Sequence, residues 1–482
     1  MRAQQSGLRR AAPAILAALT LAGAPGLYAQ GQNPTSAANP FFGSVTVRSV
    51  SDEPLKLSLD DAIALGLKNN LGLKEAENSE KSLQGQKNQV LQYFLPAITL
   101  TGDLGVHQQS LVAMGFGPDT VKEFSKLVTI PANFSFITRD DLTEGKIQFG
   151  QLLFSGPIIS AFKAIGAADR AAHFSKMSAR GEVVQQVATA YLHAIAASSE
   201  VDNARAQEST GQVLVRHAHE AHEAGVVANL DELRARVQFQ AEQQALIAAQ
   251  NALEKDLILL KREIGIDPGQ KIVLTDPAPY SDLASQTPEE VRAVAYKNRQ
   301  DYQALQNQII AVKALHGAYR SQRLPTLSFG GYYGVSQVSG AGSHGNFAAQ
   351  GNLSFPLFRE AKLRGDTDAA QAQLDAVYAQ LADLRYRIDQ QVRTALLDAG
   401  ATAKLVEVAR SNVDLASRAL ADETDRVNAG VDDNLPLVTA QATLASAESN
   451  LVESLYRYNL SKLALARAAG IIELQYRAYL GR

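Results

Sequence analysis

Apolar and polar residues alternate with a period of two along four stretches of this chain. In the first stretch, apolar or small residues on one face oppose polar residues on the other: Ile98, Leu100, Gly102, Leu104 and Val106 oppose Thr99, Thr101 and Asp103. The same pattern recurs at about 145–155, 326–337 and 346–358, and Gln151 makes the second stretch the least regular. Alternation of this kind predicts four β-strands, each with one apolar and one polar face.

Between these strands the pattern changes to a helical period. Two helices are predicted from Leu59 to Tyr93 and from Glu289 to Arg323, and each is followed by a Leu-Pro pair that contains Pro96 or Pro325. Proline cannot continue a helix, so these two residues are helix-ending structural positions.

Two much longer helices are predicted from Ile158 to Glu223 and from Arg359 to Asn428. At ~1.5 Å per residue each would span roughly 100 Å. The second has an apolar seam with steps of three or four residues, typical of a coiled coil: Leu374, Val377, Leu381, Leu384, Ile388, Val392 and Ala395. Return helices, Asp231 to Ile264 and Leu437 to Ala469, complete two antiparallel hairpins.

These elements form two copies of one helix–strand–strand–helix–helix unit. Asp60–Gly105 aligns without gaps on Glu289–Gly334 at an offset of 229, and the Ala224–Ile266 block aligns on Ala429–Ile471 at an offset of 205. The offsets differ because the first copy has the longer segment between its strands, 108–144. Two ungapped blocks in the same order indicate an internal repeat.

The chain is therefore divided by sequence as follows: 1–29, a signal peptide; 30–56, an N-terminal extension; 57–266, the first repeat, with its hairpin at 158–264 and its tip at 224–230; 267–287, an inter-repeat equatorial segment; 288–472, the second repeat, with its hairpin at 359–469 and its tip at 429–435; and 473–482, a C-terminal tail. The first segment has basic residues, an apolar run and a small residue at Ala29, which predicts export. A membrane anchor is the alternative, but the run is short and contains Pro13 and Pro25.

Composition excludes several classes of function. The net charge is −3, which gives no sign of nucleic-acid binding, and the absence of cysteine excludes disulfides and thiolate chemistry. No phosphate loop, nucleophile elbow or zinc-helix motif is present, so the chain is predicted not to be an enzyme and to need no cofactor.

The two-faced strands allow two interpretations. A soluble sheet with one wet face is the commoner source of such alternation. An exported chain with no other strand-rich region favours a membrane β-barrel instead. Four strands cannot close a barrel, and an open edge is not tolerated in lipid, so several copies would have to assemble.

The opening Leu57–Asn70 segment, the two Leu-Pro helix ends and the two Ala-Gly-Val tips resemble the TolC family of outer-membrane efflux proteins. The resemblance covers Leu57 to about Ile472. It implies a homotrimer with a twelve-stranded barrel in the outer-membrane lipid and a helical tunnel in the periplasm. It also implies two partners, a periplasmic adaptor and an inner-membrane pump of RND or ABC type.

The hairpin tips are the candidate functional residues. Gly225 and Gly430 are expected to end the long helices, and Asn229 and Asn434 to cap the return helices. By resemblance the tips also dock against the adaptor, at Gly225, Val226, Val227, Asp231, Gly430, Val431 and Asn434.

The entrance residues depart from the family. Pro436 and Thr439 occupy the positions of the aspartates that constrict the mouth, and Asp432 replaces the usual arginine partner of Asp231. Asp231, Asp432 and Asp433 are therefore the candidates for the periplasmic entrance, and the two second-tip aspartates form either a threefold acidic ring or solvated loop carboxylates.

A metal site at the first tip is not predicted. His219 and His222 lie one turn apart, but a polar helix face explains them equally well. The predicted function is a passive duct of a tripartite efflux or type I secretion system. The alternative is a soluble periplasmic coiled-coil scaffold.

Overall fold

The computed structural model describes residues 37–126, 129, 134–225, 228–277, 279–338, 342–429 and 434–481. The predicted signal peptide lies outside these residues. The chain divides into two compact units. The first unit contains the chain up to Ser82, Asp169–Gln308 and the chain from Val377 onward, and the second contains Leu83–Ala168 and Ile309–Ala376.

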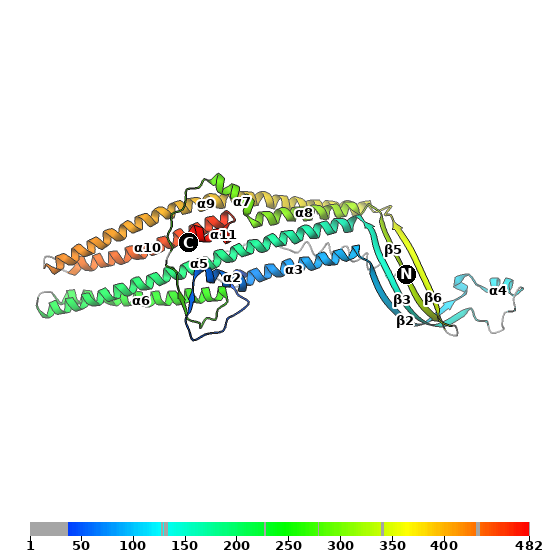
Figure 1. Ribbon diagram of the computed structural model, residues 1–482, viewed down its shortest axis with the longest axis horizontal. Helices are drawn as coiled ribbons and strands as arrows, with labels where there is room; N and C mark the ends of the chain where they lie inside the picture. Colours follow the sequence, from blue (N-terminus) through cyan, green and yellow to red (C-terminus); the bar gives the residue numbers. More distant parts are fainter. Residues whose placement is uncertain are drawn as a thin grey trace. The chain divides into compact units, whose positions relative to one another are not determined.

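Most of the described chain is helical (Figure 1). Its α-helices are α2 (Leu59–Asn69), α3 (Leu71–Leu91), α4 (Pro118–Phe124), α5 (Gly156–Glu223), α6 (Asn229–Ile264), α7 (Pro288–Asn298), α8 (Gln300–Ser321), α9 (Glu360–Asn428), α10 (Asn434–Ala468) and α11 (Ile472–Leu480). Short 3-10 helices are η1 (Pro40–Phe42), η2 (Gln92–Phe94) and η3 (Val112–Met114). The strands are β1 (Leu55–Leu57), β2 (Ala97–Ser110), β3 (Ile137–Ser155), β4 (Ile272–Leu274), β5 (Thr326–Val338) and β6 (His344–Ser354).

Each repeat opens with a capped helix. At the start of α2 the Ser58 hydroxyl accepts from the backbone N–H of Asp61 at 3.1 Å, and the Asp61 carboxylate accepts from the Ser58 N–H. Thr287 and Glu290 form the same reciprocal pair at the start of α7. This capping box satisfies two N–H groups that would otherwise have no partner. It therefore sets the residue at which the first helix of each repeat begins.

The single first helix predicted in each repeat is wrong, because each is two helices. Asn70 adopts an extended conformation between α2 and α3, and its amide donates to the Phe41 carbonyl at 2.6 Å. In the second repeat Arg299 is extended between α7 and α8, and its guanidinium reaches Asp301 and Gln391. Both breaks are held by side-chain contacts with distant parts of the chain.

The long helices α5 and α9 are continuous, as predicted, and each turns back into a return helix, α6 or α10. The seam expected along α9 is buried throughout, from Leu374 to Ala395. Burial of the seam stabilises the coiled-coil arrangement that its three- and four-residue steps predict.

The second unit contains a four-stranded antiparallel sheet in the order β2-β3-β5-β6 (Figure 1). Its strands differ in length from those predicted. β2 continues to Ser110 and β3 begins at Ile137, so the connection between them is shorter than the 108–144 expected. β6 ends at Ser354 because Pro356 follows and cannot donate to the ladder.

A second, two-stranded sheet was not foreseen. In the first unit β1 and β4 pair in parallel, with Leu55 opposite Ile272 and Leu57 opposite Leu274. The Tyr191 hydroxyl on α5 donates to the Leu57 carbonyl at 2.9 Å and also contacts Asp276. The extension before the first repeat and the segment between the repeats are thereby joined beside α5.

No helix in the described part of the chain is both long enough and apolar enough to cross a membrane.

Candidate functional sites at the hairpin ends and on the sheet

The first hairpin end is built on a left-handed glycine. α5 ends at Glu223, and Gly225 follows with φ +74°. A side chain at that φ would be strained, which explains the glycine. The predicted docking residues Val226 and Val227 lie outside the described residues. The predicted cap is wrong by one residue: Ala228 precedes α6 without a side-chain bond, and Asn229 is the first helical residue.

A charged cluster joins the two helices just behind this end. The Glu232 carboxylate on α6 is buried and contacts His219 Nδ1 on α5 at 3.1 Å and Arg236 at 2.5 Å. The other ring nitrogen of His219 lies 3.4 Å from Glu223. Burial alone would raise the pKa of Glu232, but the hydrogen bond from His219 and the charges of Arg236 and His219 lower it below its ordinary value.

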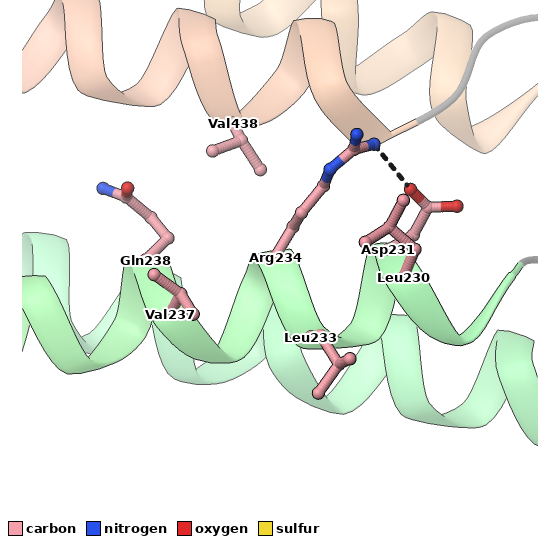
Figure 2. A pocket seen from close by; sticks show the side chains of 7 residues that line it. All are labelled: Leu230, Asp231, Leu233, Arg234, Val237, Gln238 and Val438. Atoms are coloured by element: carbon pink, nitrogen blue, oxygen red, sulfur yellow. Dashed lines mark hydrogen bonds and ion pairs between the residues drawn. The ribbon is translucent and has the colours of Figure 1, made fainter.

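A shallow apolar pocket of about 390 Å³ lies on the α10-facing side of α6. Figure 2 shows the side chains that line it: Leu230, Asp231, Leu233, Arg234, Val237, Gln238 and Val438. Leu230, Leu233 and Val237 are all exposed despite their size. Large apolar side chains exposed together on one helix mark a surface suited to another helix.

Asp231, the entrance residue of the first end, pairs within its own helix. Its carboxylate lies 3.2 Å from the Arg234 guanidinium, an i, i+3 contact (Figure 2). The second hairpin end is described up to Ala429 and again from Asn434, the first residue of α10. Gly430, Val431, Asp432 and Asp433 lie outside the described residues, and the acidic ring therefore stays a prediction.

His219, behind the first end, has carboxylate partners on both helices of the hairpin. His219 contacts two glutamates, as above, and no group of three or more His, Cys, Asp or Glu in the described residues could hold a metal ion. Sequence reasoning singled out His219 but missed its contact with Glu232 and the pairing of Glu232 with Arg236. Their signal was a helical i, i+4 pair of opposite charge close to the turn.

The two helix-ending prolines lie at the entry to the sheet. α3 and η2 end before Leu95, and α8 ends at Ser321, so Pro96 and Pro325 each stand directly before a strand. The chain changes from helix to strand at equivalent points of the two repeats.

The sheet has one apolar and one polar face, as its alternation predicts. On one face Leu100 and Leu104 are 80% and 83% exposed, and Ile147, Tyr333 and Phe347 lie on the same face. The opposite face carries polar contacts: Gln148 donates to Thr101 at 3.2 Å, and Asn346 donates to Ser336 at 2.9 Å. β2 and β6 are the edge strands of this sheet.

The sequence model of the outer membrane efflux protein family matches residues 62–265 and 292–471. The chain belongs to this family. Membership places it in the outer membrane, and the two matched segments coincide with the two repeats.

Individual relatives are distant. The toluene efflux pump outer membrane protein TtgF of Pseudomonas putida is 23% identical over 296 residues, which cover 60% of this chain and 60% of that protein. The alkaline protease secretion protein AprF of Pseudomonas aeruginosa is 23% identical over 305 residues, 61% of this chain and 62% of AprF. The similarity thus spans about three-fifths of the length of these relatives.

Solved structures share the fold over more of the chain. The outer-membrane channel OprN superposes with a TM-score of 0.69 at 19% identity and covers 86% of this chain and 89% of OprN. The Campylobacter jejuni CmeC outer membrane channel gives 0.70 at 16% identity and covers 93% and 94%. These similarities confirm the predicted fold class, a helical tunnel protein whose strands contribute to a β-barrel.

Proposed function

We propose that this chain is the outer-membrane duct of a tripartite efflux or type I secretion system. Three copies would assemble into one channel and conduct substrates passively from the periplasm to the exterior. The energy would come from an inner-membrane partner, because the duct itself carries out no chemistry.

The observation that carries this proposal is the four-stranded sheet with one exposed apolar face and two free edges. Backbone groups on a strand edge have no partner in lipid, where each unpaired group costs several kcal/mol. Pairing β6 of one copy with β2 of the next would remove both edges. Three sheets of four strands close into a barrel of twelve.

The soluble scaffold is disfavoured by the same face. In water it would expose Leu100, Leu104, Tyr333, Phe347 and other large apolar side chains over all four strands. Soluble monomers rarely expose a contiguous apolar patch of this kind. Relatives in the same family are named as pump or secretion components, in agreement with a duct.

The partners are proposed from the hairpin ends. The exposed apolar residues Leu230, Leu233 and Val237 suit the helical hairpin of a periplasmic adaptor, which would add an apolar stripe to this surface. The adaptor would connect the duct to an inner-membrane pump of RND or ABC type. The tip residues Gly225, Val226, Val227, Asp231, Gly430, Val431 and Asn434 are proposed to contact the adaptor, and Asp231, Asp432 and Asp433 to line the entrance.

Fractionation and conductance together test the duct. The protein should remain with outer membranes after carbonate washing, be extracted by detergent as a trimer, and conduct ions in a planar lipid bilayer. A soluble monomer or dimer would contradict the proposal.

The adaptor contact is tested by a single cysteine, since the chain has none of its own. Leu233→Cys should form a cross-link to the helical hairpin of the adaptor, identified by mass spectrometry of the joined peptides. Glu123→Cys, on the exposed helix α4 of the sheet unit, is the control and should form none. Equal cross-linking from both positions would contradict adaptor docking at this surface and leave the duct intact.

A further inference from the structure

Among the described side chains, the polar face of the sheet is mostly uncharged, but one level of it carries a group of charges. Asp103 on β2 lies opposite Glu144 on β3 in the strand register. Lys146 forms an ion pair with Glu144, and its ammonium lies 5.0 Å from the centre of the Tyr332 ring on β5. Among the described side chains of β5 and β6 on this face, only His344 could add a further charge.

Glu144 and Lys146 are held in position by their ion pair. The Glu144 side chain is 10% exposed even in a single copy, and that of Lys146 is 22% exposed. Asp103 on β2 is paired with Glu144 on β3, and Lys146 follows Glu144 by two residues on β3. Lys146 therefore lies diagonally across from Asp103. Two carboxylates directly opposite one another repel, and a neighbouring ammonium relieves that repulsion. The ring of Tyr332 adds a cation–π contact that keeps the ammonium on this face.

The group has an unbalanced charge. Asp103 and Glu144 are negative and Lys146 is positive, so one net negative charge remains in each copy while His344 is neutral. Closing three copies into a barrel would bring three such groups to the same level around one lumen. We name Asp103, Glu144 and Lys146 the luminal charge band.

Screening decides whether such a band can act on passing ions. Twelve strands spaced about 4.8 Å apart and tilted by about 40° enclose a lumen with a backbone radius of roughly 12 Å. Side chains that project by roughly 5 Å leave about 7 Å, which is within the Debye length of about 8 Å at physiological ionic strength. Ions on the axis therefore experience the charge of the band.

We propose that the luminal charge band sets the ion selectivity of the duct, favouring cations over anions within the β-barrel. Glu144 and Asp103 supply the negative potential. Lys146 limits it and fixes the position of Glu144. This proposal rests on the proposed duct function and assigns its selectivity to the sheet instead of to the hairpin ends.

Reversal potentials test the proposal. Purified trimers in a planar bilayer under a KCl gradient should show a preference for K⁺ over Cl⁻. Glu144→Gln and Asp103→Asn should each lower the K⁺/Cl⁻ permeability ratio by about twofold or more, because each removes one charge per copy from the lumen. Lys146→Met should raise the ratio by a similar factor.

Glu123→Gln is the matched control. Glu123 forms an exposed ion pair with Lys126 near α4, so this variant removes the same charge from the same kind of pair away from the sheet. Its ratio should equal that of the wild type. The exchange variant Glu144→Lys with Lys146→Glu preserves the net charge and should also keep the wild-type ratio. Trimer assembly of every variant is checked on a gel without heating. Asp103→Asn and the exchange variant decide the outcome if Glu144→Gln fails to assemble.

The two proposals fail in different ways. Ratios for Glu144→Gln, Asp103→Asn and Lys146→Met that equal the Glu123→Gln ratio would overturn the luminal charge band and leave the duct in place. A wild-type trimer that conducts no ions would overturn the duct and, with it, the band.

Discussion

The two long helices α5 and α9 come from equivalent positions of the two repeats, yet their polar side chains have different partners. On α5, His173 and Lys176 contact Glu80 on α3, and Arg180 contacts Glu473 on α11. On α9 some ion pairs reach α7, such as Asp389–Arg292 and Arg393–Glu289. Towards its hairpin end the ion pairs stay within the helix, one turn apart: Asp414–Arg418 and Glu423–Arg426. α5 is thus enclosed by other elements of its own chain, whereas α9 keeps a free face towards its hairpin end.

The apolar side chains show the same difference. In the described chain Val213 is the exposed large apolar residue of α5, whereas α9 exposes six: Tyr378, Tyr386, Leu397, Leu405, Val408 and Leu415. Several of these lie opposite the buried seam of α9. A helix with a second apolar stripe has room for a second neighbour, which agrees with a tunnel closed by further copies of the chain.

The return helices differ in where they bury charge. At the offset of 205, Glu263 in α6 corresponds to Ala468, and Lys462 in α10 corresponds to Leu257. All four positions are buried. Each repeat therefore has a charged residue where the other has an apolar one, so duplication preserved the helices while the surroundings of each copy changed.

The largest effect is expected from the enclosed helix. Tyr191 on α5 is fully buried and donates to the Leu57 carbonyl and to Asp276. Tyr191→Ala should lower the free energy of unfolding by about 3–5 kcal/mol, because it leaves a cavity and removes a buried hydrogen-bond donor. Chemical denaturation in detergent, followed by helical circular dichroism, measures this.

Tyr386 on α9 is the control for that change, since 79% of it is exposed in the single chain. Tyr386→Ala should change the unfolding of the protomer by less than about 0.5 kcal/mol. Equal losses for the two tyrosines would show that the two helices are not as different as their contacts indicate.

The next effect depends on pH and concerns Glu263. Burial raises the pKa of its carboxyl to about 7 from an ordinary value of 4.5, although the hydrogen bond from Gln186 acts to lower it. The folded chain therefore holds a proton that the unfolded chain releases between these values, so stability falls as the pH rises from about 4.5 to 7. Glu263→Gln removes this dependence and should exceed the wild type by about 3 kcal/mol above pH 7.

Below pH 4.5 the Glu263→Gln variant and the wild type should have equal stability. The control is Glu453→Gln on α10, an exposed residue paired with Arg457. Its stability difference from the wild type should be the same at both pH values. Thermal unfolding at pH 4 and pH 8 gives both comparisons. A constant difference between Glu263→Gln and the wild type across this range would contradict the raised pKa.

A substitution on the free face of α9 should have a smaller energetic effect per copy, and it should act on trimer assembly. Leu397 is 73% exposed in one chain. If the next copy covers it, Leu397→Asp should cost about 1.5–3 kcal/mol of burial per copy and shift the trimer towards monomers. Gel filtration in detergent measures the shift. Asp414→Asn, on the same helix but in an internal ion pair, should leave the trimer unchanged.

The sequence predicted the features that depend on local pattern. Period-two alternation located all four strands of the sheet, and the seam of α9 was correct residue by residue because burial follows helical spacing. The sequence did not predict that the first helix of each repeat is interrupted at Asn70 or Arg299. These interruptions are stabilised by contacts with Phe41 and Gln391, which are distant in the sequence and leave no local pattern. The early start of β3 was missed because Thr138–Thr143 does not alternate, and its backbone pairing with β2 decides its structure.

At the candidate sites, sequence located the glycine turn and the Asp231 position but not the partners of either hairpin end. Asp231 pairs with Arg234 of its own helix, and Glu232 is buried against His219. Whether a polar helix residue points to solvent or to a neighbouring helix depends on the angle at which the helices meet. No local pattern contains that angle.

The smallest effect is local and contrasts the two hairpin ends. At the same offset of 205, His219 and Glu232 correspond to Thr424 and Leu437, and Leu437 lies in an apolar cluster with Leu214, Ala218 and Ala235. The first end thus has an ion pair where the second contributes Leu437 to an apolar cluster that both hairpins share. His219→Gln should speed amide hydrogen exchange at the start of α6 severalfold while the rest of the chain exchanges as before.

Acid should act on the same cluster. The pKa of Glu232 is lowered in the folded chain, so its contribution is present above its ordinary value of 4.5 and is lost as the pH falls through the lower folded value. Glu232→Leu, which places the residue of the second repeat in the first, should abolish this acid sensitivity at the start of α6. The control is Thr424→Gln on α9, which should leave exchange in α6 unaffected. If His219→Gln and Thr424→Gln had the same effect on α6, the ion pair would not be what holds the first hairpin end, and the two ends would differ in composition alone.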